Sequence, residues 1–290
     1  MKSAPFSYER PESVQQALEI LDQHGGMARI LAGGQSLAPM LQMRLMQLSA
    51  VVDINRLPGL DEIRAEGGVT AFGPLVRYAA IARSPLVSER LPLLGHVVRY
   101  VGDPQVRNRG TLAGSLAQAD PTGEMPVACL ALDATIVASS VSGAREIGID
   151  EFLVGSYATA LEPEEMLTEV RFPVVPDSFV FLERNRKHND FAVINIAVVG
   201  RRGSGGSWSA LRIALGGVND RAVLAAGAAQ LLEGSTLEDD RIEQAAQSAL
   251  EVVDPPSDVR GSAEYRLHLV PVYVRRALSM LREGMEGGYA

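Results

Sequence analysis

A pair of glycines directly after a predicted strand is the first feature of the sequence that could bind a ligand. Residues 28–32 form a short, mainly apolar run typical of a buried strand, and Gly33-Gly34-Gln35-Ser36 follows at once. Glycines at such a point let the chain turn tightly and leave backbone N–H groups unshielded. The helix predicted after the turn would direct the positive end of its dipole at the same place. Gln35 and Ser36 add side-chain donors, so the segment is a candidate anion site.

The second candidate segment covers residues 109–121, where small residues and hydroxyls alternate. This composition lets the backbone approach a ligand closely, and two such turns could clamp a pyrophosphate from both sides. Either segment alone has an ordinary explanation, because a glycine turn after a strand is most often only a turn. The prediction therefore depends on the two segments together.

Motifs for several other chemistries are absent from the sequence. It contains no strand-linked G-x-G-x-x-G and no G-x-x-x-x-G-K-[ST], which disfavours a Rossmann NAD site and a P-loop. Ser115 stands outside any G-x-S-x-G motif and has no evident His and Asp partners, so we do not expect hydrolase catalysis. Cys129 is the single cysteine, which excludes an internal disulfide and an iron–sulfur cluster held by this chain. No metal site is expected, because metal-ligand spacing is missing among His24, His96, His188 and His268.

The spacing of apolar residues predicts a small α/β unit in the first 55 residues. It consists of helices over 13–24 and about 37–48 and of strands over 28–32 and 50–54. Residues 60–100 mix short strands and helices, with Gly67-Gly68 as a hairpin turn, and residues 101–126 are rich in turn formers.

Pro173 and Pro176 follow a turn and strand predicted over 163–172 and indicate a domain boundary. Beyond them, two antiparallel strands precede three helices, an order typical of an α+β domain. The strands are expected over 191–201 and 209–215, and the helices near 221–233, 238–253 and 262–283. We therefore expect an α+β fold with an N-terminal domain over 1–175, divided into subdomains over about 1–55 and 56–175, and a smaller C-terminal domain over 176–290.

The composition is that of a globular protein with an acidic surface. Hydrophobic residues make up 47% of the chain and charged residues 21%, and the formal net charge is -8. An acidic surface disfavours nucleic acid as a partner, because phosphate binding needs clustered Lys and Arg. No stretch approaches the roughly 18 apolar residues of a membrane span, and the start lacks the apolar region of a secretory signal. With one cysteine, these features favour the cytoplasm.

The two glycine segments together resemble those of the FAD-binding medium subunits of the xanthine dehydrogenase and carbon monoxide dehydrogenase family. In that family a strand–AGG[HQ]S–helix turn and a later RG[TS][IL]GGS…ADP segment cradle the FAD pyrophosphate. Here they stand as Ala32-Gly33-Gly34-Gln35-Ser36 and as Arg109-Gly110-Thr111-Leu112-Ala113-Gly114-Ser115, ending at Ala119-Asp120-Pro121. The likeness continues through residues 52–55, 103–108, 164–167, 186–187, 212–218 and 258–265, in order, and so covers nearly the whole chain.

The resemblance implies a PCMH-type FAD domain of two α/β subdomains and a non-covalent FAD. The residues that would hold the pyrophosphate and ribose are Arg29, Ile30, Leu31, Ala32, Gly33, Gly34, Gln35, Ser36, Leu37, Thr111, Leu112, Ala113, Gly114 and Ser115, and Gly110 also belongs to the expected cofactor-binding set. The adenosine side or its approach would be lined by Val101, Gly102, Ala117 and Glu124. Met166 and Leu167 would place backbone groups beside the isoalloxazine, with Lys187, Asp190 and Phe191 at its edge. Asp120 completes the expected cofactor-binding set.

Some of these residues also have an ordinary structural interpretation. Asp120 is a common turn residue, Phe191 could belong to the core, and Lys187 could be a solvated surface charge. The sequence also departs from the family at two positions. Gln35 stands where the carbon monoxide branch usually has His, and Ala113 where the second segment usually has Gly. Neither change removes a backbone N–H group, but both weaken the case for carbon monoxide as the substrate.

The resemblance also implies the place of the chain in a larger enzyme. Molybdopterin and [2Fe-2S] clusters would reside on a large and a small partner subunit, in a dimer of heterotrimers, and the flavin would relay electrons to a terminal acceptor. Three alternatives remain at this point: a self-sufficient flavoprotein oxidase or reductase, the medium subunit of a carbon monoxide dehydrogenase in particular, and a non-enzymatic assembly or nucleotide-binding subunit without flavin.

Overall fold

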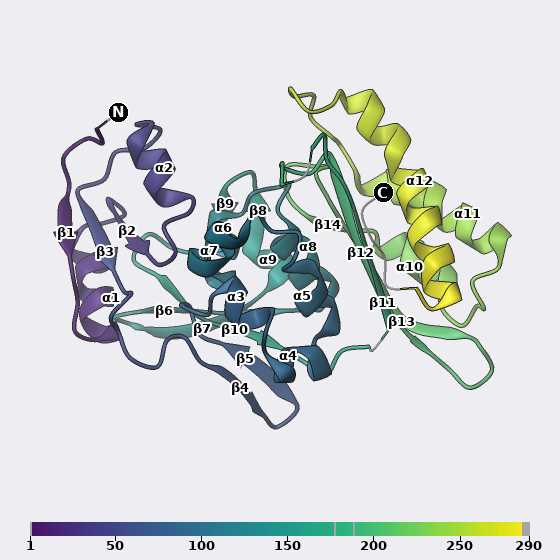
Figure 1. The fold of residues 1–290 in the computed structure, drawn as a ribbon, viewed down its shortest axis with the longest axis horizontal. Coiled ribbons are helices and arrows are strands. Elements are labelled where there is room, and N and C mark those ends of the chain that lie inside the picture. The colour runs from purple at the N-terminus through teal and green to yellow at the C-terminus, as the bar shows by residue number, and fades with distance from the viewer. Residues whose placement is uncertain (1, 177, 188, 286–290) are drawn as a thin grey trace.

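The chain forms three units that follow one another along its longest axis, each built on its own sheet (Figure 1). The structure is a computed structural model and describes residues 2–176, 178–187 and 189–285. We refer to residues 2–55 as the N-terminal unit, 56–176 as the central unit and 178–285 as the C-terminal unit. His188, one of the four histidines, lies outside the described residues.

The N-terminal unit is a three-stranded parallel sheet with two helices. Its strands β1 (Ser7–Glu9), β3 (Ala50–Asp53) and β2 (Ala28–Leu31) lie in that order. Helix α1 (Val14–Gln23) begins at Ser13, whose side chain accepts a hydrogen bond from the backbone of Gln16, and it buries Ala17, Leu18 and Leu21. These elements confirm the α/β unit expected from the first 55 residues.

Helix α2 (Leu37–Gln42) is shorter than the helix predicted over 37–48. The chain leaves the helix at Arg44, which has a φ of 57° in the left-handed region. Leu45, which the periodicity placed on the buried face, is 67% exposed, while Leu48 packs with Leu41 in a separate small cluster. The prediction was wrong because apolar residues on both sides of a left-handed turn reproduced a helical spacing.

The central unit is built on a five-stranded antiparallel sheet of order β4-β5-β10-β6-β7. Its strands are β4 (Ile63–Glu66), β5 (Val69–Phe72), β6 (Thr135–Ser140), β7 (Gly143–Gly148) and β10 (Met166–Phe172), and β8 (Leu153–Gly155) pairs separately with β9 (Ala158–Thr159). The Gly67-Gly68 turn between β4 and β5 is confirmed, since both glycines have positive φ as a tight hairpin turn requires.

Seven helices complete the central unit. They are α3 (Tyr78–Ile81), α4 (Pro85–Arg90), α5 (Pro92–Val97), α6 (Pro104–Arg109), α7 (Leu112–Gln118), α8 (Glu124–Ala131) and α9 (Ile149–Phe152). Three of them begin within residues 101–126, which the sequence indicated as turn-rich. Two of the polar residues there are helix caps, since the side chains of Asp103 and Thr111 each accept a hydrogen bond from the backbone of the third residue that follows.

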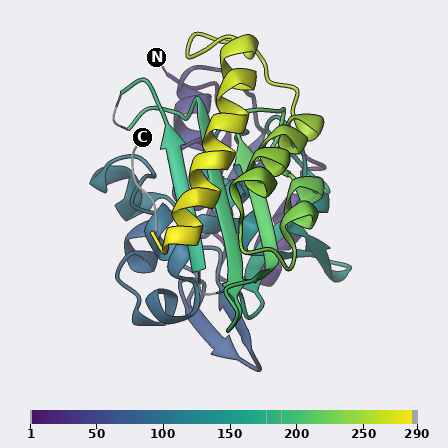
Figure 2. The same ribbon diagram turned by 90° about the vertical axis from the view of Figure 1, so that its right-hand side faces the viewer.

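The C-terminal unit is an antiparallel sheet covered on one face by helices. Its strands are β11 (Ser178–Arg184), β12 (Ile194–Arg202), β13 (Trp208–Gly216) and β14 (Val223–Leu224), and its helices are α10 (Ala226–Leu232), α11 (Asp239–Ser248), a 3-10 helix (Ala249–Val252) and α12 (Ala263–Glu283). Figure 2 shows α12 lying across the strands with α10 and α11 beside it. Strands followed by helices confirm the α+β character expected from the sequence.

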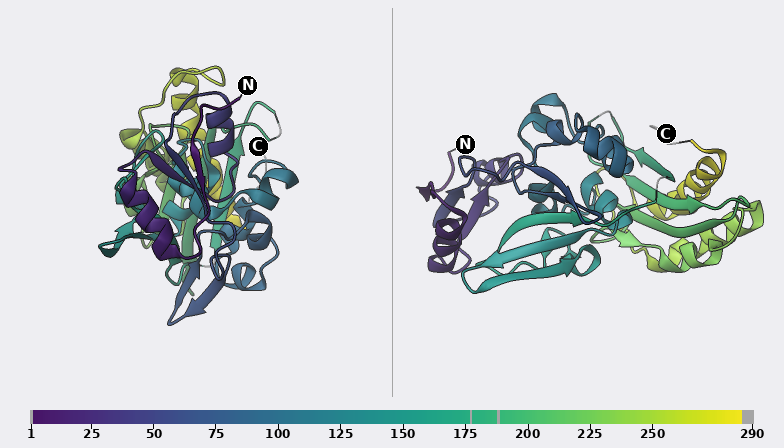
Figure 3. Two further views of the ribbon diagram at one scale, coloured as in Figure 1. Left: turned by 90° about the vertical axis from the view of Figure 1, so that its left-hand side faces the viewer. Right: turned by 90° about the horizontal axis from the view of Figure 1, so that it is seen from below.

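The other face of this sheet joins the C-terminal unit to the central unit (Figure 3). Val180 and Leu182 of β11 pack under the helices, whereas Phe179 and Phe181 belong to the core of the central unit. A sheet buried on both faces is fixed firmly, because sliding it would expose apolar side chains on either side. The backbone N–H of Gly217, just after β13, donates to the carbonyl of Pro121, which follows the end of α7.

Candidate cofactor site

The two glycine segments lie in direct contact. A Cβ atom on Gly33 would stand 2.4 Å from the carbonyl oxygen of Arg109 and 2.9 Å from the Cα of Gly110. The helices that follow are also linked, since the Gln118 amide donates to the Met40 sulfur at 3.5 Å. The structure therefore brings together the two segments that the sequence predicts as one pyrophosphate site.

Unpaired backbone N–H groups line the first segment. Within the part of the chain that the structure describes, the N–H groups of Gly34, Gln35 and Ser36 have no acceptor in the chain. Gly34 has a φ of +73°, which favours glycine, and a Cβ there would approach only the Leu31 side chain, at 3.2 Å. Because α2 has six residues, its dipole is small, and the free N–H groups supply most of the attraction for an anion.

The second segment is the start of a helix rather than a turn. Thr111 caps α7, and its hydroxyl accepts the N–H of Gly114 at 3.0 Å. Gly114 lies exposed on the first turn, with Ser115 partly buried beside it. Ala113 points into the core at 4% exposure, so its methyl group does not face the ligand, and its φ is negative as expected. The presence of Ala113 in place of the family's Gly therefore leaves the exposed surface of the two glycine segments unaltered.

Other residues of the two segments serve the scaffold. The Arg29 guanidinium donates to the carbonyls of Gly26 and Ala28. Both carbonyls precede the glycine turn, so this side chain supports the strand rather than the turn. Gly110 is buried, and a Cβ there would meet the Tyr78 ring at 2.7 Å. Apolar packing fixes the other predicted residues of these two segments, namely Ile30, Leu31, Ala32, Leu37 and Leu112. The part of the two segments that is open to a ligand is thus residues 34–36 with the start of α7.

A second group of predicted residues lines a cavity of about 210 Å³ at the junction of the central and C-terminal units. The Asp120 carboxylate accepts from Thr122 at 2.7 Å and from the Tyr157 hydroxyl at 3.3 Å. Phe191 is 51% exposed, so it is not a core residue. Its ring faces the Arg260 guanidinium, whose Cζ lies 4.6 Å from the ring centroid. This is a favourable cation–π contact.

Arg260 and Tyr157 were not among the predicted site residues. Arg260 stands in the segment 258–265 that carries part of the resemblance. An arginine by itself, however, does not indicate which side chain it contacts. Its Nε donates to Asp190 at 3.4 Å, and the buried Arg266 holds Asp258 of the same loop at 2.8 Å. Only the tertiary structure places these side chains beside Phe191.

Two acidic side chains, the partly buried Glu124 and the buried Glu183, have raised pKa values. Burial raises the pKa of Glu124, the first residue of α8, to about 7, and the negative charge of Asp120 adds to the shift. Burial also raises the pKa of Glu183 to about 9, with the Glu124 carboxyl as a further cause. One Glu183 carboxyl oxygen has no hydrogen-bond partner. A protonated carboxyl is the form that burial favours here.

The remaining predicted residues are more widely spread. Val101 is buried in the core, and Arg107 donates to its carbonyl at 3.1 Å and to that of Gly102 at 2.7 Å. Met166 and Leu167 are buried at the start of β10, where only their backbone can face a ligand. Ala117 and Lys187 are exposed. The structure does not bring Lys187 into either group.

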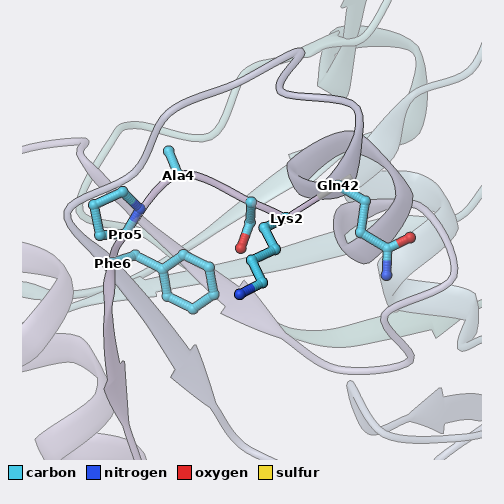
Figure 4. A pocket seen from close by; sticks show the side chains of 6 residues that line it. Lys2, Ala4, Pro5, Phe6 and Gln42 are labelled. Carbon is cyan, nitrogen blue, oxygen red and sulfur yellow. The ribbon is translucent and has the colours of Figure 1, made fainter.

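Another hollow lies at the N-terminal segment. Figure 4 shows Lys2, Pro5 and Phe6 around it, with Gln42 from the end of α2. It is open to solvent and contains none of the residues predicted from the sequence, so we assign it no role. The described residues contain no group of His, Cys, Asp and Glu able to hold a metal ion. None of the helices that the structure describes is long and apolar enough to cross a membrane.

Sequence comparison identifies the family of both parts of the chain. Residues 4–175 match the family described as FAD binding domain in molybdopterin dehydrogenase. Residues 179–281 match the CO dehydrogenase flavoprotein C-terminal domain. The chain is 39% identical to the 6-hydroxypseudooxynicotine dehydrogenase complex subunit alpha of Paenarthrobacter nicotinovorans, over 96% of this chain and 95% of that protein. It is 37% identical to the carbon monoxide dehydrogenase medium chain of Hydrogenophaga pseudoflava, over 94% and 96%.

Solved structures show the same fold over the whole length. A chain of the carbon monoxide dehydrogenase from Hydrogenophaga pseudoflava superposes with a TM-score of 0.94 at 36% identity, covering 98% of this chain and 100% of that one. A chain of quinoline 2-oxidoreductase from Pseudomonas putida 86 gives 0.92 at 37%, covering 98% and 99%. The protein therefore belongs to the family of FAD-binding medium subunits of the molybdenum hydroxylases.

Proposed function

We propose that this chain binds one FAD non-covalently across its two glycine segments and serves as the electron-transfer subunit of a molybdenum-containing dehydrogenase. When bound, FAD supplies the redox chemistry. The residues of the chain bind and orient it: the N–H groups of residues 34–36 and the start of α7 fit the pyrophosphate. Phe191 lies at the edge of the flavin ring in the arrangement that the family resemblance implies.

The contact between Gly33 and Arg109 is the observation that carries this proposal. The two segments are 76 residues apart in the sequence, and each alone is an ordinary structural feature. Their contact concentrates unpaired N–H groups and glycine surface at one place, which suits a diphosphate. An apolar ligand would gain little from such a site, because the exposed donors would lose their hydrogen bonds to water.

Partner subunits are needed to complete the enzyme. Cys129 is the single cysteine and is buried, so iron–sulfur clusters must come from another chain. Relatives of this chain are named as medium subunits or as subunits of complexes. We infer a large molybdopterin-binding partner and a small iron–sulfur partner, assembled as a dimer of heterotrimers. A cytoplasmic location stays a prediction from the cysteine content.

The organic substrate is expected to be chosen by the large partner. Relatives at 39%, 37%, 36% and 33% identity belong to enzymes named for a nicotine derivative, carbon monoxide, glyceraldehyde and caffeine. Such different molecules share no recognition chemistry, yet the chain hardly changes in length. A flavin subunit of this kind thus fits the same electron-transfer role in all of these enzymes.

Purification of the full chain tests the proposal. We expect about one FAD per chain, all of it released by denaturation and filtration, and reducible by dithionite in the folded protein. The chain alone should not bleach its flavin with an organic substrate, whereas adding the partner subunits should restore that reaction. FMN in place of FAD, or flavin retained on the unfolded chain, would refute non-covalent FAD binding, and bleaching by substrate without partners would refute the relay.

A further inference from the structure

One arginine joins the two glycine segments. Arg77 precedes α3, and its guanidinium donates through Nη1 to the carbonyl of Arg109 and through Nη2 to the side-chain oxygen of Asn55. The Arg109 carbonyl is the atom against which Gly33 packs. Arg77 therefore holds the second segment at the point where it contacts the first.

Asn55 holds the first segment in the same way. Its amide nitrogen donates to the carbonyl of Ala32 at 2.8 Å and to that of Leu31 at 3.2 Å, the last residues before the glycine turn. Asp53, itself an acceptor for the Tyr8 hydroxyl, fixes the amide at 2.6 Å. The side chains of Asn55 and Arg77 thus form a continuous bridge from residue 32 to residue 109, between the N-terminal and central units.

The bridge also brings positive charge to the cradle. Burial and the charge of the Arg109 guanidinium lower the pKa of Arg77, while the carboxylates of Asp61 and Asp53 raise it. Within the described residues, neither of them forms an ion pair. Both guanidinium groups repel each other, and a diphosphate bound at the two segments would attract both of them.

We propose that Arg77 is a positioning residue for the cofactor, which holds the two glycine segments at the separation that the FAD pyrophosphate requires. Neither Arg77 nor Asn55 belongs to the segments that the family resemblance assigns to FAD. The planar fork of a guanidinium suits this task, because it fixes two acceptors at once. The inference rests on the proposed FAD function, so the experiment must separate a failure of one from a failure of the other.

The test is a double-mutant cycle on FAD affinity in the full chain. Arg77→Ala should weaken FAD binding about tenfold or more, as expected for lost hydrogen bonds from a charged donor. Gly33→Ala pushes the same segments apart. If the bridge sets their separation, both changes disrupt the same arrangement of the two segments, so the double variant should lose clearly less than the product of the two single losses.

Arg282→Ala is a matched control. Arg282 likewise donates to one carbonyl, that of Leu237, and to one side chain, that of Asp239, but it lies in the C-terminal unit. It should leave FAD affinity unchanged. Arg77→Lys keeps the charge and can reach one acceptor, so its loss should be smaller than that of Arg77→Ala. This variant also keeps the test valid if Arg77→Ala does not fold.

The outcomes separate the two hypotheses. A wild-type chain that binds no FAD refutes the proposed function. Wild-type FAD affinity in Arg77→Ala, or losses that multiply in the double variant, overturns the positioning role and leaves the proposed function in place. If Arg77→Ala does not fold, a loss in Arg77→Lys that multiplies with that of Gly33→Ala counts against the inference in the same way.

Discussion

Replacing Gly33 by Ala tests the contact on which the cofactor site depends. The added methyl carbon would lie 2.4 Å from the Arg109 carbonyl oxygen, and contacts of that kind become ordinary near 3.4 Å. The two segments must therefore separate by about 1 Å. Both neighbours, Arg109 and Gly110, present backbone atoms, so no side-chain rotation can relieve the overlap.

The size of the effect follows from the cost of inserting a methyl group into a packed site. Such overpacking typically costs about 1–3 kcal/mol. The chain without FAD can relieve much of it by letting the segments part, whereas the chain with FAD must close them. We therefore expect most of the strain to appear as weaker FAD binding, about 5- to 100-fold, with a smaller loss in the free energy of unfolding.

FAD titration of the variant, followed by flavin fluorescence, measures the first quantity, and urea denaturation of the FAD-free chain measures the second. Gly205→Ala is the control, because no atom lies within 4 Å of the added carbon and the residue has no positive φ. If Gly33→Ala binds FAD as tightly as Gly205→Ala does, the two segments do not enclose the pyrophosphate.

Three further predictions concern other parts of the site. Gly34→Val and Gly114→Val should each leave the chain folded without FAD, seen as loss of flavin absorbance per chain; normal flavin content in both would exclude the cradle. Because the folded state raises the pKa of Glu183 from 4.5 to about 9, the free energy of unfolding should fall as pH rises between these values. Glu183→Gln should flatten this fall in urea titrations, and an unchanged slope would contradict the buried proton. Phe191→Ala should slow flavin reduction in stopped-flow assays of the assembled complex without lowering FAD content, and an unchanged rate would place electron entry elsewhere.

The local sequence determined those helices and turns whose stabilising contacts lie within a few residues of one another. Ser13 caps a helix with a regular apolar face, and Gly67-Gly68 joins two strands, and both were predicted because the physical cause lies within a few residues. The start of α7 was different. Thr111 is a cap there, but beside so many small residues the sequence favoured a turn.

Helix α2 shows the limit of periodicity. Its predicted end at about residue 48 assumed one continuous helix, yet Arg44 turns the chain into the left-handed region and Leu45 faces solvent. Apolar spacing cannot distinguish a helix from a turn that happens to bury residues at the same interval. Packing of Leu48 against Leu41 and Val51 decides the path.

The sequence by itself determined which residues could hold a diphosphate, because glycine, hydroxyl and amide groups carry that capacity wherever they lie. The tertiary structure decided that the two segments meet, since the contact between Gly33 and Arg109 depends on how the N-terminal and central units pack. It also placed Arg77 and Asn55 between the two segments and Arg260 beside Phe191. A guanidinium or an amide has many possible partners, and only the fold fixes which acceptor or ring lies within its reach.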